Sequence, residues 1–265
     1  KSESLACPLG WFALDFDLPL LAAQRAADRP TSGVRDGRLL LALDNGLHDL
    51  GEVAAMPLTL NGRAAYNIAN IAGAGLTATA LGSPADTIAL ALSRFGQAQA
   101  DNPGRLQRWQ FGALDVFVDY AHNPDGLQGL LEAVDAKRRT GRLAIVLGHA
   151  GNREDADLRA VAAMAATVHP DLVMLRDIAG YERGREAGEI AAIMRAQLLA
   201  DAVPADAIRT CLDEVEAARV PLAWARDGDL LVLPIHEMEA REQVTALLDQ
   251  MAAAGWRAGD ALPPG

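Results

Sequence analysis

Cysteine, lysine and long apolar runs are all scarce in this chain of 265 residues. Its two cysteines, Cys7 and Cys211, belong to no CxxC or Cys/His pattern, which argues against a disulfide framework or a structural zinc site. No run of about 18 apolar residues occurs, so no membrane span is expected. No basic segment followed by an apolar one marks a secretory signal. We therefore expect a cytoplasmic protein that has no membrane partner.

Positive charge is also in short supply, and Lys1 and Lys137 are the only lysines. Any site in which a lysine holds phosphate must use one of them or lie outside the chain. The net charge of −11 at pH 7 repels nucleic-acid backbones, so no nucleic-acid partner is expected. With 51% hydrophobic residues the chain can bury a large core, and a small molecule is the expected ligand.

Several motifs of catalysis and metal binding are missing as well. The sequence contains no HExxH, GxSxG or paired metal-ligand pattern, and we predict no metal site. It also lacks the GxxxxGK[ST] loop that binds nucleotide phosphates. Gly73-Ala74-Gly75 resembles part of a dinucleotide loop, but it lies inside a helical pattern without a preceding strand, so close helix packing is the better interpretation.

The first hundred residues predict a small antiparallel sheet followed by helices. Short apolar runs at 13–16, 39–43 and 56–60 are separated by Asp-Gly and Asn-Gly turn signals, which are typical of hairpins. Helical spacing follows over 64–81 and 84–95. We therefore predict that residues 1–100 form one domain, joined to the next by a linker around 97–104.

Residues 101–265 have a different pattern. Nearly continuous apolar runs alternate with helical periodicity, which indicates a parallel sheet covered on both faces. The runs lie at 114–118, 143–147, 172–175 and 230–233, with a further short strand expected at 207–210. The predicted fold is α/β, and this second domain is a doubly wound, mostly parallel, Rossmann-like sheet.

Polar residues follow each of these predicted strands. Ligands of open α/β sheets bind outside the carboxyl ends of the strands, so these residues are the candidates for a site. They are Asp119, Tyr120, His122 and Asn123 after the first strand, His149, Asn152 and Arg153 after the second, Arg183 and Arg185 after the third, and His236 after the fourth. Taken singly, each has a common structural alternative as a helix cap or a solvated loop residue. Asn123 before Pro124, for example, has the pattern of an N-cap.

The run Val118 to Gly126, VDYAHNPDG, resembles the motif that opens the C-terminal domain of the Mur ligase superfamily. This superfamily includes the Mur ligases, folylpolyglutamate synthetases and cyanophycin synthetases, which are ATP-dependent amino-acid ligases. Asn67 and Asn70 resemble the paired asparagines of the central domain, although Tyr66 stands where a histidine often precedes them. Pro103-Gly104-Arg105 resembles the linker arginine motif. The segment 183–189 is most similar to the cyanophycin synthetase branch.

The resemblance implies an ADP-forming reaction that makes an amide bond through an acyl phosphate. ATP phosphorylates a carboxylate on a peptide-like acceptor, and the amino group of an incoming amino acid then attacks. It also implies roles for individual residues. Asn67, Asn70, Arg105 and Asp119 would bind the nucleotide, His122 and Asn123 would lie at the phosphates, and His149, Asn152, Arg153, Arg183 and Arg185 would face the substrates.

The departures from the family pattern limit what this chain is expected to do. The P-loop, the metal-binding positions and the modified lysine of the central domain are missing, so most ligands of ATP and Mg²⁺ are expected outside this chain. We interpret residues 1–100 as the tail of a central domain, in a truncated or cleaved chain starting at Lys1, and expect the chain alone to be inactive. The alternative is a non-catalytic pseudo-ligase that binds or assembles. The amino acid, the acceptor and self-association stay open.

Overall fold

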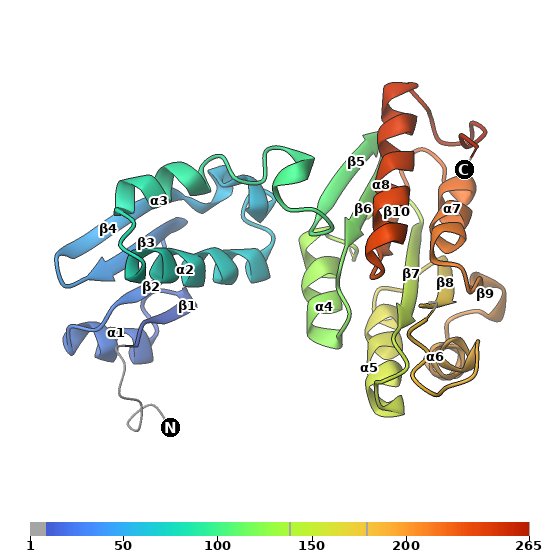
Figure 1. The fold of residues 1–265 in the computed structure, drawn as a ribbon, viewed down its shortest axis with the longest axis horizontal. Coiled ribbons are helices and arrows are strands. Elements are labelled where there is room, and N and C mark those ends of the chain that lie inside the picture. The colour runs from blue at the N-terminus through green and yellow to red at the C-terminus, as the bar shows by residue number, and fades with distance from the viewer. Residues whose placement is uncertain (1–8, 138, 179, 265) are drawn as a thin grey trace. The chain divides into compact units, whose positions relative to one another are not determined.

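The computed structural model describes residues 9–137, 139–178 and 180–264. The chain divides into two compact units, Lys1–Asp101 and Asn102–Gly265, which we call unit 1 and unit 2 and describe separately (Figure 1). No helix of the described residues is long and apolar enough to cross a bilayer.

Unit 1 is built on a four-stranded sheet with the strand order β1-β2-β3-β4. Its elements are β1 (Trp11–Asp15), α1 (Pro19–Ala26), β2 (Thr31–Arg35), β3 (Arg38–Leu43), β4 (Gly46–Glu52), the short 3-10 helices η2 (Val53–Ala55) and η3 (Pro57–Thr59), α2 (Ala65–Ala80), α3 (Ala85–Leu92) and η4 (Gln99–Asp101). Figure 1 shows α2 and α3 lying along this sheet, and apolar side chains from the sheet and both helices form its core.

Two expectations for unit 1 need correction. The sheet is mixed, because β1 runs parallel to β2 while β2, β3 and β4 are antiparallel. The reason is that α1 carries the chain back across the sheet before β2 begins. The apolar run 56–60 forms no strand, since Pro57 starts a 3-10 turn and Leu60 adopts the left-handed conformation. The Asp36-Gly37 turn does join a hairpin, and both residues have the positive φ that a type I′ turn requires.

Unit 2 is a six-stranded sheet with the order β5-β6-β10-β7-β8-β9, in which only the β5–β6 pair is antiparallel. Its elements are β5 (Gln107–Phe111), β6 (Leu114–Asp119), α4 (Pro124–Ala133), β7 (Leu143–His149), α5 (Asp155–Ala166), β8 (Leu172–Asp177), α6 (Glu189–Ala200), η5 (Ala205–Ala207), β9 (Ile208–Thr210), α7 (Glu214–Trp224), β10 (Leu230–Pro234) and α8 (Met238–Ala253). The five strands predicted from apolar runs are all present. The predicted doubly wound, mostly parallel sheet is confirmed.

Helices cover both faces of this sheet (Figure 1). Helices α4, α5 and α6 pack against one another on one face, and α7 and α8 pack together on the other. Strand β10 lies between β6 and β7, and the helix that follows β10 takes the opposite face from the helices that follow its neighbours. The carboxyl end of β10 is therefore a topological switch point, where ligands of doubly wound sheets bind.

The first strand and the last helix of unit 2 are joined directly. The indole Nε1 of Trp109, in β5, donates a hydrogen bond of 2.8 Å to Asp249 Oδ1 in α8. Phe111 packs edge-on against Trp256, with ring centroids 5.2 Å apart. These aromatic side chains belong to the same buried cluster as the central strands, so α8 completes the core of unit 2.

Candidate functional site

Asp119 ends β6 at the switch point, and its side chain is 5% exposed. Its Oδ2 accepts a hydrogen bond of 2.7 Å from the Leu106 amide, and its Oδ1 accepts one of 2.7 Å from the Ala121 amide. Burial raises the pKa of the Asp119 carboxyl, while these amides and the charge of Arg105 oppose the rise. Each carboxylate oxygen keeps a further lone pair, so the oriented carboxylate can accept hydrogen bonds from a ligand hydroxyl.

Two guanidinium groups lie close to the ring of Tyr120. The Cζ atom of Arg105 is 4.7 Å from the ring centroid, and that of Arg241 is 5.7 Å away. Gly104 makes room for Arg241, because a Cβ at position 104 would stand 2.4 Å from the Arg241 Cδ atom. Arg241 was not among the predicted site residues. The signal for it was available, since α8 begins at the same sheet edge and Arg241 lies in its first turn.

Three histidines gather at the carboxyl ends of three neighbouring strands. His122 follows β6, His149 ends β7 and His236 follows β10, and their ring centroids are 6.1 to 6.4 Å apart. The rule that polar residues at the carboxyl ends meet at one edge therefore holds for these three side chains. No group of histidine, cysteine or acidic residues within the described ranges is arranged to hold a metal ion.

Hydrogen bonds indicate which ring nitrogen of His149 and of His236 carries the proton. His149 accepts the Ala150 amide at Nδ1, so its Nε2 carries the proton and donates to the His122 carbonyl, 2.6 Å away. His236 likewise donates from Nε2 to the Ala121 carbonyl, 2.9 Å away. Burial lowers the pKa of His149, and burial together with the charge of Arg176 holds the pKa of His236 well below its usual value. Both rings are therefore neutral, and through their hydrogen bonds to the His122 and Ala121 carbonyls they hold the loop after β6 in place.

His122 is the most available imidazole of the three. Its Nδ1 donates to the Tyr120 carbonyl at 3.1 Å, and its Nε2 has no hydrogen-bond partner among the residues that the structure describes. The ring is partly exposed. Held in this way, the His122 ring can present its Nε2 atom to a ligand at the sheet edge.

Asn123 has the structural role that the sequence offered as an alternative. Its Oδ1 accepts a hydrogen bond of 2.7 Å from the Gly126 amide and so caps α4, with Pro124 in the first turn. Its Nδ2 group donates to no residue in the described part of the chain. Asn123 therefore positions the helix that carries the chain away from the site, whatever else it contacts.

The loops after β7 and β8 hold each other through Arg185. Its guanidinium forms ion pairs of 2.8 Å with Asp155 and with Glu189, and donates to the carbonyls of Gly151 and Arg153. These contacts use four of the five N–H donors of the guanidinium, which leaves no pair for a bidentate contact with a substrate carboxylate. The structure thus places Arg185 as a brace between the two loops.

The remaining predicted residues of these loops are exposed. Asn152, Arg153 and Arg183 all reach solvent on this side of unit 2. Arg183 adopts a positive φ of 51°, and its guanidinium lies 5.1 Å from the centroid of the Tyr181 ring. Its charge is not neutralised by an ion pair within the described residues. Arg153 and Arg183 are therefore the cations here that can meet an anionic substrate.

The two predicted asparagines of unit 1 differ in environment. Asn67 is 6% exposed, and its Nδ2 donates a hydrogen bond of 2.8 Å to the Leu58 carbonyl. It therefore ties the first turn of α2 to η3. Asn70, one turn later on α2, is exposed. Of this pair, Asn70 is the one whose carboxamide faces solvent.

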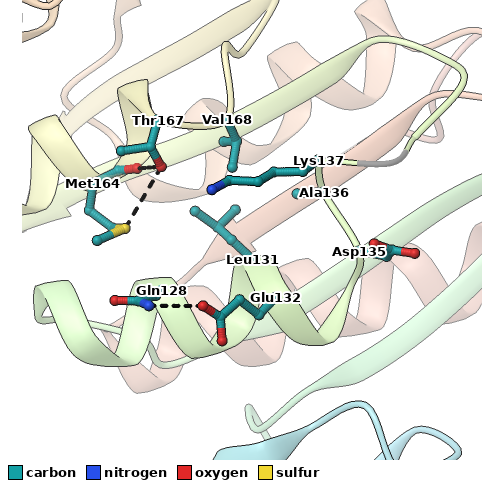
Figure 2. A pocket seen from close by; sticks show the side chains of 9 residues that line it. All are labelled: Gln128, Leu131, Glu132, Asp135, Ala136, Lys137, Met164, Thr167 and Val168. Atoms are coloured by element: carbon teal, nitrogen blue, oxygen red, sulfur yellow. Dashed lines mark hydrogen bonds between the residues drawn. The ribbon is translucent and has the colours of Figure 1, made fainter.

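A separate cavity of about 340 Å³ lies between the ends of α4 and α5 (Figure 2). Leu131, Ala136, Met164 and Val168 give it an apolar floor, and Figure 2 shows the Lys137 side chain extending over it. The cavity lies where α4 and α5 end, whereas the polar residues described above lie where they begin. None of the predicted site residues lines it.

Comparison with known proteins now gives this geometry a context. Residues 104–234 match the family model described as Mur ligase, glutamate ligase domain. The cyanophycin synthetase of Crocosphaera subtropica is 28% identical over 232 residues, which cover 88% of this chain and 26% of that protein. The UDP-N-acetylmuramoyl-L-alanyl-D-glutamate-2,6-diaminopimelate ligase of Gloeobacter violaceus is 44% identical over 91 residues, covering 34% of this chain and 18% of that ligase.

Solved structures show the same fold. The murein peptide ligase Mpl of Psychrobacter arcticus superposes with a TM-score of 0.58 at 14% identity, covering 97% of this chain and 47% of that one. FolC of E. coli in complex with ADP gives a TM-score of 0.57 at 19% identity, covering 89% of this chain and 53% of that one. The chain spans about a quarter of the length of the cyanophycin synthetases that it matches. Residues 104–234 of this chain therefore form a Mur ligase, glutamate ligase domain.

Proposed function

We propose that this chain is the C-terminal part of an ADP-forming, ATP-dependent amino-acid ligase. In this reaction a substrate carboxylate attacks the γ-phosphorus of ATP and releases ADP, and an amine then displaces phosphate from the acyl phosphate to form an amide. Residues 1–101 would be the tail of the ATP-binding central domain. The relatives named as ligases and synthetases support this reaction class.

The observation that carries the proposal is the Asp119 carboxylate, fixed at the switch point of a Mur ligase domain. Two backbone amides orient it, and Arg105 contributes positive charge nearby. A carboxylate with lone pairs left over suits the vicinal hydroxyls of a ribose, and Arg105 can fork between ribose and phosphate oxygens. The ADP complexes among the structural neighbours agree with a nucleotide at this fold.

The phosphate end of the site would be served by His122. Its uncommitted Nε2 lies at the edge where the carboxyl ends of β6, β7 and β10 meet. Only with a proton on this nitrogen as well would the ring donate to a phosphoryl oxygen and stabilise the charge that develops there. Most ligands of a magnesium ion would lie outside this chain, and the ion would supply charge neutralisation at the phosphates.

The incoming amino acid would bind at the loops after β7 and β8. Arg153 and Arg183 are exposed there, and a guanidinium pairs well with an α-carboxylate. The cyanophycin synthetase relatives favour a peptide-like acceptor. Which amino acid is added is a matter for experiment.

The decisive experiment is a ligation screen of the longer protein that carries this chain. It would be incubated with ATP, a panel of amino acids and peptide acceptors, with ADP release followed and the amide product identified by mass spectrometry. We expect ADP release to depend on both substrates. The isolated 265-residue chain is the matched control, and we expect it to show no turnover and weak ATP binding. A longer protein that binds its partners without releasing ADP would establish the non-catalytic alternative instead.

A further inference from the structure

A fully buried ion pair lies behind the candidate site, formed by two residues that the reaction does not require directly. Arg176, near the end of β8, is 0% exposed, and Glu214, at the start of α7, is 7% exposed. The Arg176 Nη2 atom lies 2.7 Å from Glu214 Oε1. Burial raises the pKa of Glu214 and lowers that of Arg176, while the charge of each opposes the shift of the other. Removing both charges from water costs free energy, so a buried pair does not by itself stabilise the folded protein.

The Arg176 side chain runs from β8 across the neighbouring strand β7 to reach this partner. Gly148, its neighbour on β7, makes the crossing possible, because a Cβ at position 148 would stand 2.7 Å from the Arg176 Cγ atom. Beyond β7, the guanidinium also donates a hydrogen bond of 2.9 Å to the Pro234 carbonyl at the end of β10. One side chain therefore links β8 to the strand at the switch point.

Glu214 also holds the loop after β10 through hydrogen bonds to its backbone. Its Oε1 accepts a hydrogen bond of 2.6 Å from the His236 amide, and its Oε2 accepts one of 3.2 Å from the Glu237 amide. Glu237 in turn caps α8 through the Ala240 amide. The backbone from which the His236 ring projects is thus fixed by the buried carboxylate.

The last contact reaches the candidate site. The His236 imidazole donates to the Ala121 carbonyl, and the Ala121 amide donates to Asp119. We propose that Arg176 and Glu214 are positioning residues, which hold His236 against Ala121 and thereby fix the loop that carries Asp119 and His122. The desolvation cost of the buried pair is then balanced by a site that is ordered before the ligand arrives.

The structural part of this inference is tested by hydrogen exchange on the chain itself. The probes are the Leu106 and Ala121 amides, both of which donate to Asp119. In Arg176→Met and Glu214→Gln we expect the Ala121 amide to exchange up to about tenfold faster, the equivalent of one lost hydrogen bond. Glu214→Gln keeps its size and carries the test should Arg176→Met fail to fold.

The matched control is Arg142→Met, at the opposite edge of the sheet. Arg142 forms an ion pair with the buried Asp229, where β7 and β10 begin. This variant should lose stability without a selective loss of protection at Ala121. The positioning role would be overturned if the faster exchange at Ala121 were explained by the loss of global stability in all three variants alike.

The functional part rests on the proposed function and is measured on the longer protein. We expect Arg176→Met and Glu214→Gln to lower kcat/KM for ATP by about tenfold to a hundredfold, since small displacements of a site residue have such effects. Arg176→Lys, which keeps the charge, should recover part of the loss, and Arg142→Met should keep kcat/KM. Unchanged kcat/KM in both pair variants would reject the inference. If the variants show the expected exchange pattern but the wild-type longer protein does not ligate, the proposed function is rejected and the positioning role is not.

Discussion

Gly151 lies directly against the backbone of Glu182. A Cβ at position 151 would stand 1.8 Å from the Glu182 carbonyl oxygen, and the Gly151 amide donates a hydrogen bond of 2.8 Å to the Tyr181 carbonyl. The loops after β7 and β8 therefore touch backbone to backbone, with Arg185 bracing them from the side. The proposed amino-acid site depends on this contact.

Gly151→Ala should separate the two loops. The added methyl group meets backbone rather than a flexible side chain, so we expect a loss of about 1–3 kcal/mol in the free energy of unfolding, or more. Urea denaturation measures it. Gly75→Ala, inside α2, is the control, because its Cβ would meet Leu50 at an ordinary 3.5 Å and alanine favours a helix. Equal stability of the two variants would contradict the close approach.

Arg183 and Arg185 should give opposite results when each is replaced. We expect Arg183→Ala to raise KM for the amino acid about tenfold in the longer protein, through loss of a charge-assisted hydrogen bond, with little change in Tm. Arg185→Ala should instead lower Tm, because it removes the brace to Asp155 and Glu189. Steady-state kinetics and thermal unfolding of both variants decide the assignment, which fails if Arg185→Ala alone changes KM and leaves Tm intact.

Asp119 and Arg105 should control the requirement for ATP. We expect Asp119→Asn and Arg105→Ala each to raise KM for ATP about tenfold to a hundredfold, the effect of losing a hydrogen bond to a charged group. Asparagine is the milder replacement for Asp119, because its one carboxamide oxygen can still accept from one of the buried amides of Leu106 and Ala121, whereas alanine would leave both without an acceptor. Unchanged ATP kinetics in both variants would reject the ribose assignment.

The neutral histidines should make unit 2 sensitive to acid. The folded pKa values of His149 and His236 lie below the ordinary value of 6.5, so the unfolded chain binds protons more readily than the folded one. Their contribution to stability is complete above pH 6.5 and is lost as the pH falls toward the folded pKa values. The raised pKa values of Asp119 and Glu214 act in the opposite direction.

A variant isolates the histidine contribution. His236→Gln keeps a donor near the Nε2 position but does not titrate, so its free energy of unfolding should fall less than that of the wild type between pH 7.5 and 5.5. Urea titrations at several pH values measure the difference. Parallel curves for the two proteins would show that His236 is not held neutral in the folded state.

The buried strands of unit 2 were predictable because both of their faces are covered. Such strands are apolar up to their carboxyl ends, as in β7 and β8, and need no partner to be recognised. The edge strand β5 was missed, although Gln107–Phe111 alternates buried and exposed residues as an antiparallel strand should. Strand β4 was also missed, since Leu50 is its one buried residue and most of its other side chains are polar or absent.

The gathering of the histidines was predictable, but the partners of the individual residues were not. The carboxyl-edge rule needs only that the strands are parallel. The Arg176–Glu214 pair depends in addition on β10 lying next to β7, a strand order that local patterns do not contain. Asn67 and Arg185 resembled ligand residues by motif, whereas their hydrogen bonds go to carbonyls and carboxylates brought close by the fold.

The hydrogen bond between Trp109 and Asp249 has a consequence for how the protein is made. It joins residues 140 positions apart, so β5 has no neighbour on its α8 side until most of unit 2 has been synthesised. During translation Trp109 and Phe111 would stay exposed while the ribosome completes the later strands. The formation of unit 2 should therefore be a late and cooperative event, because contacts between residues far apart in the sequence slow folding.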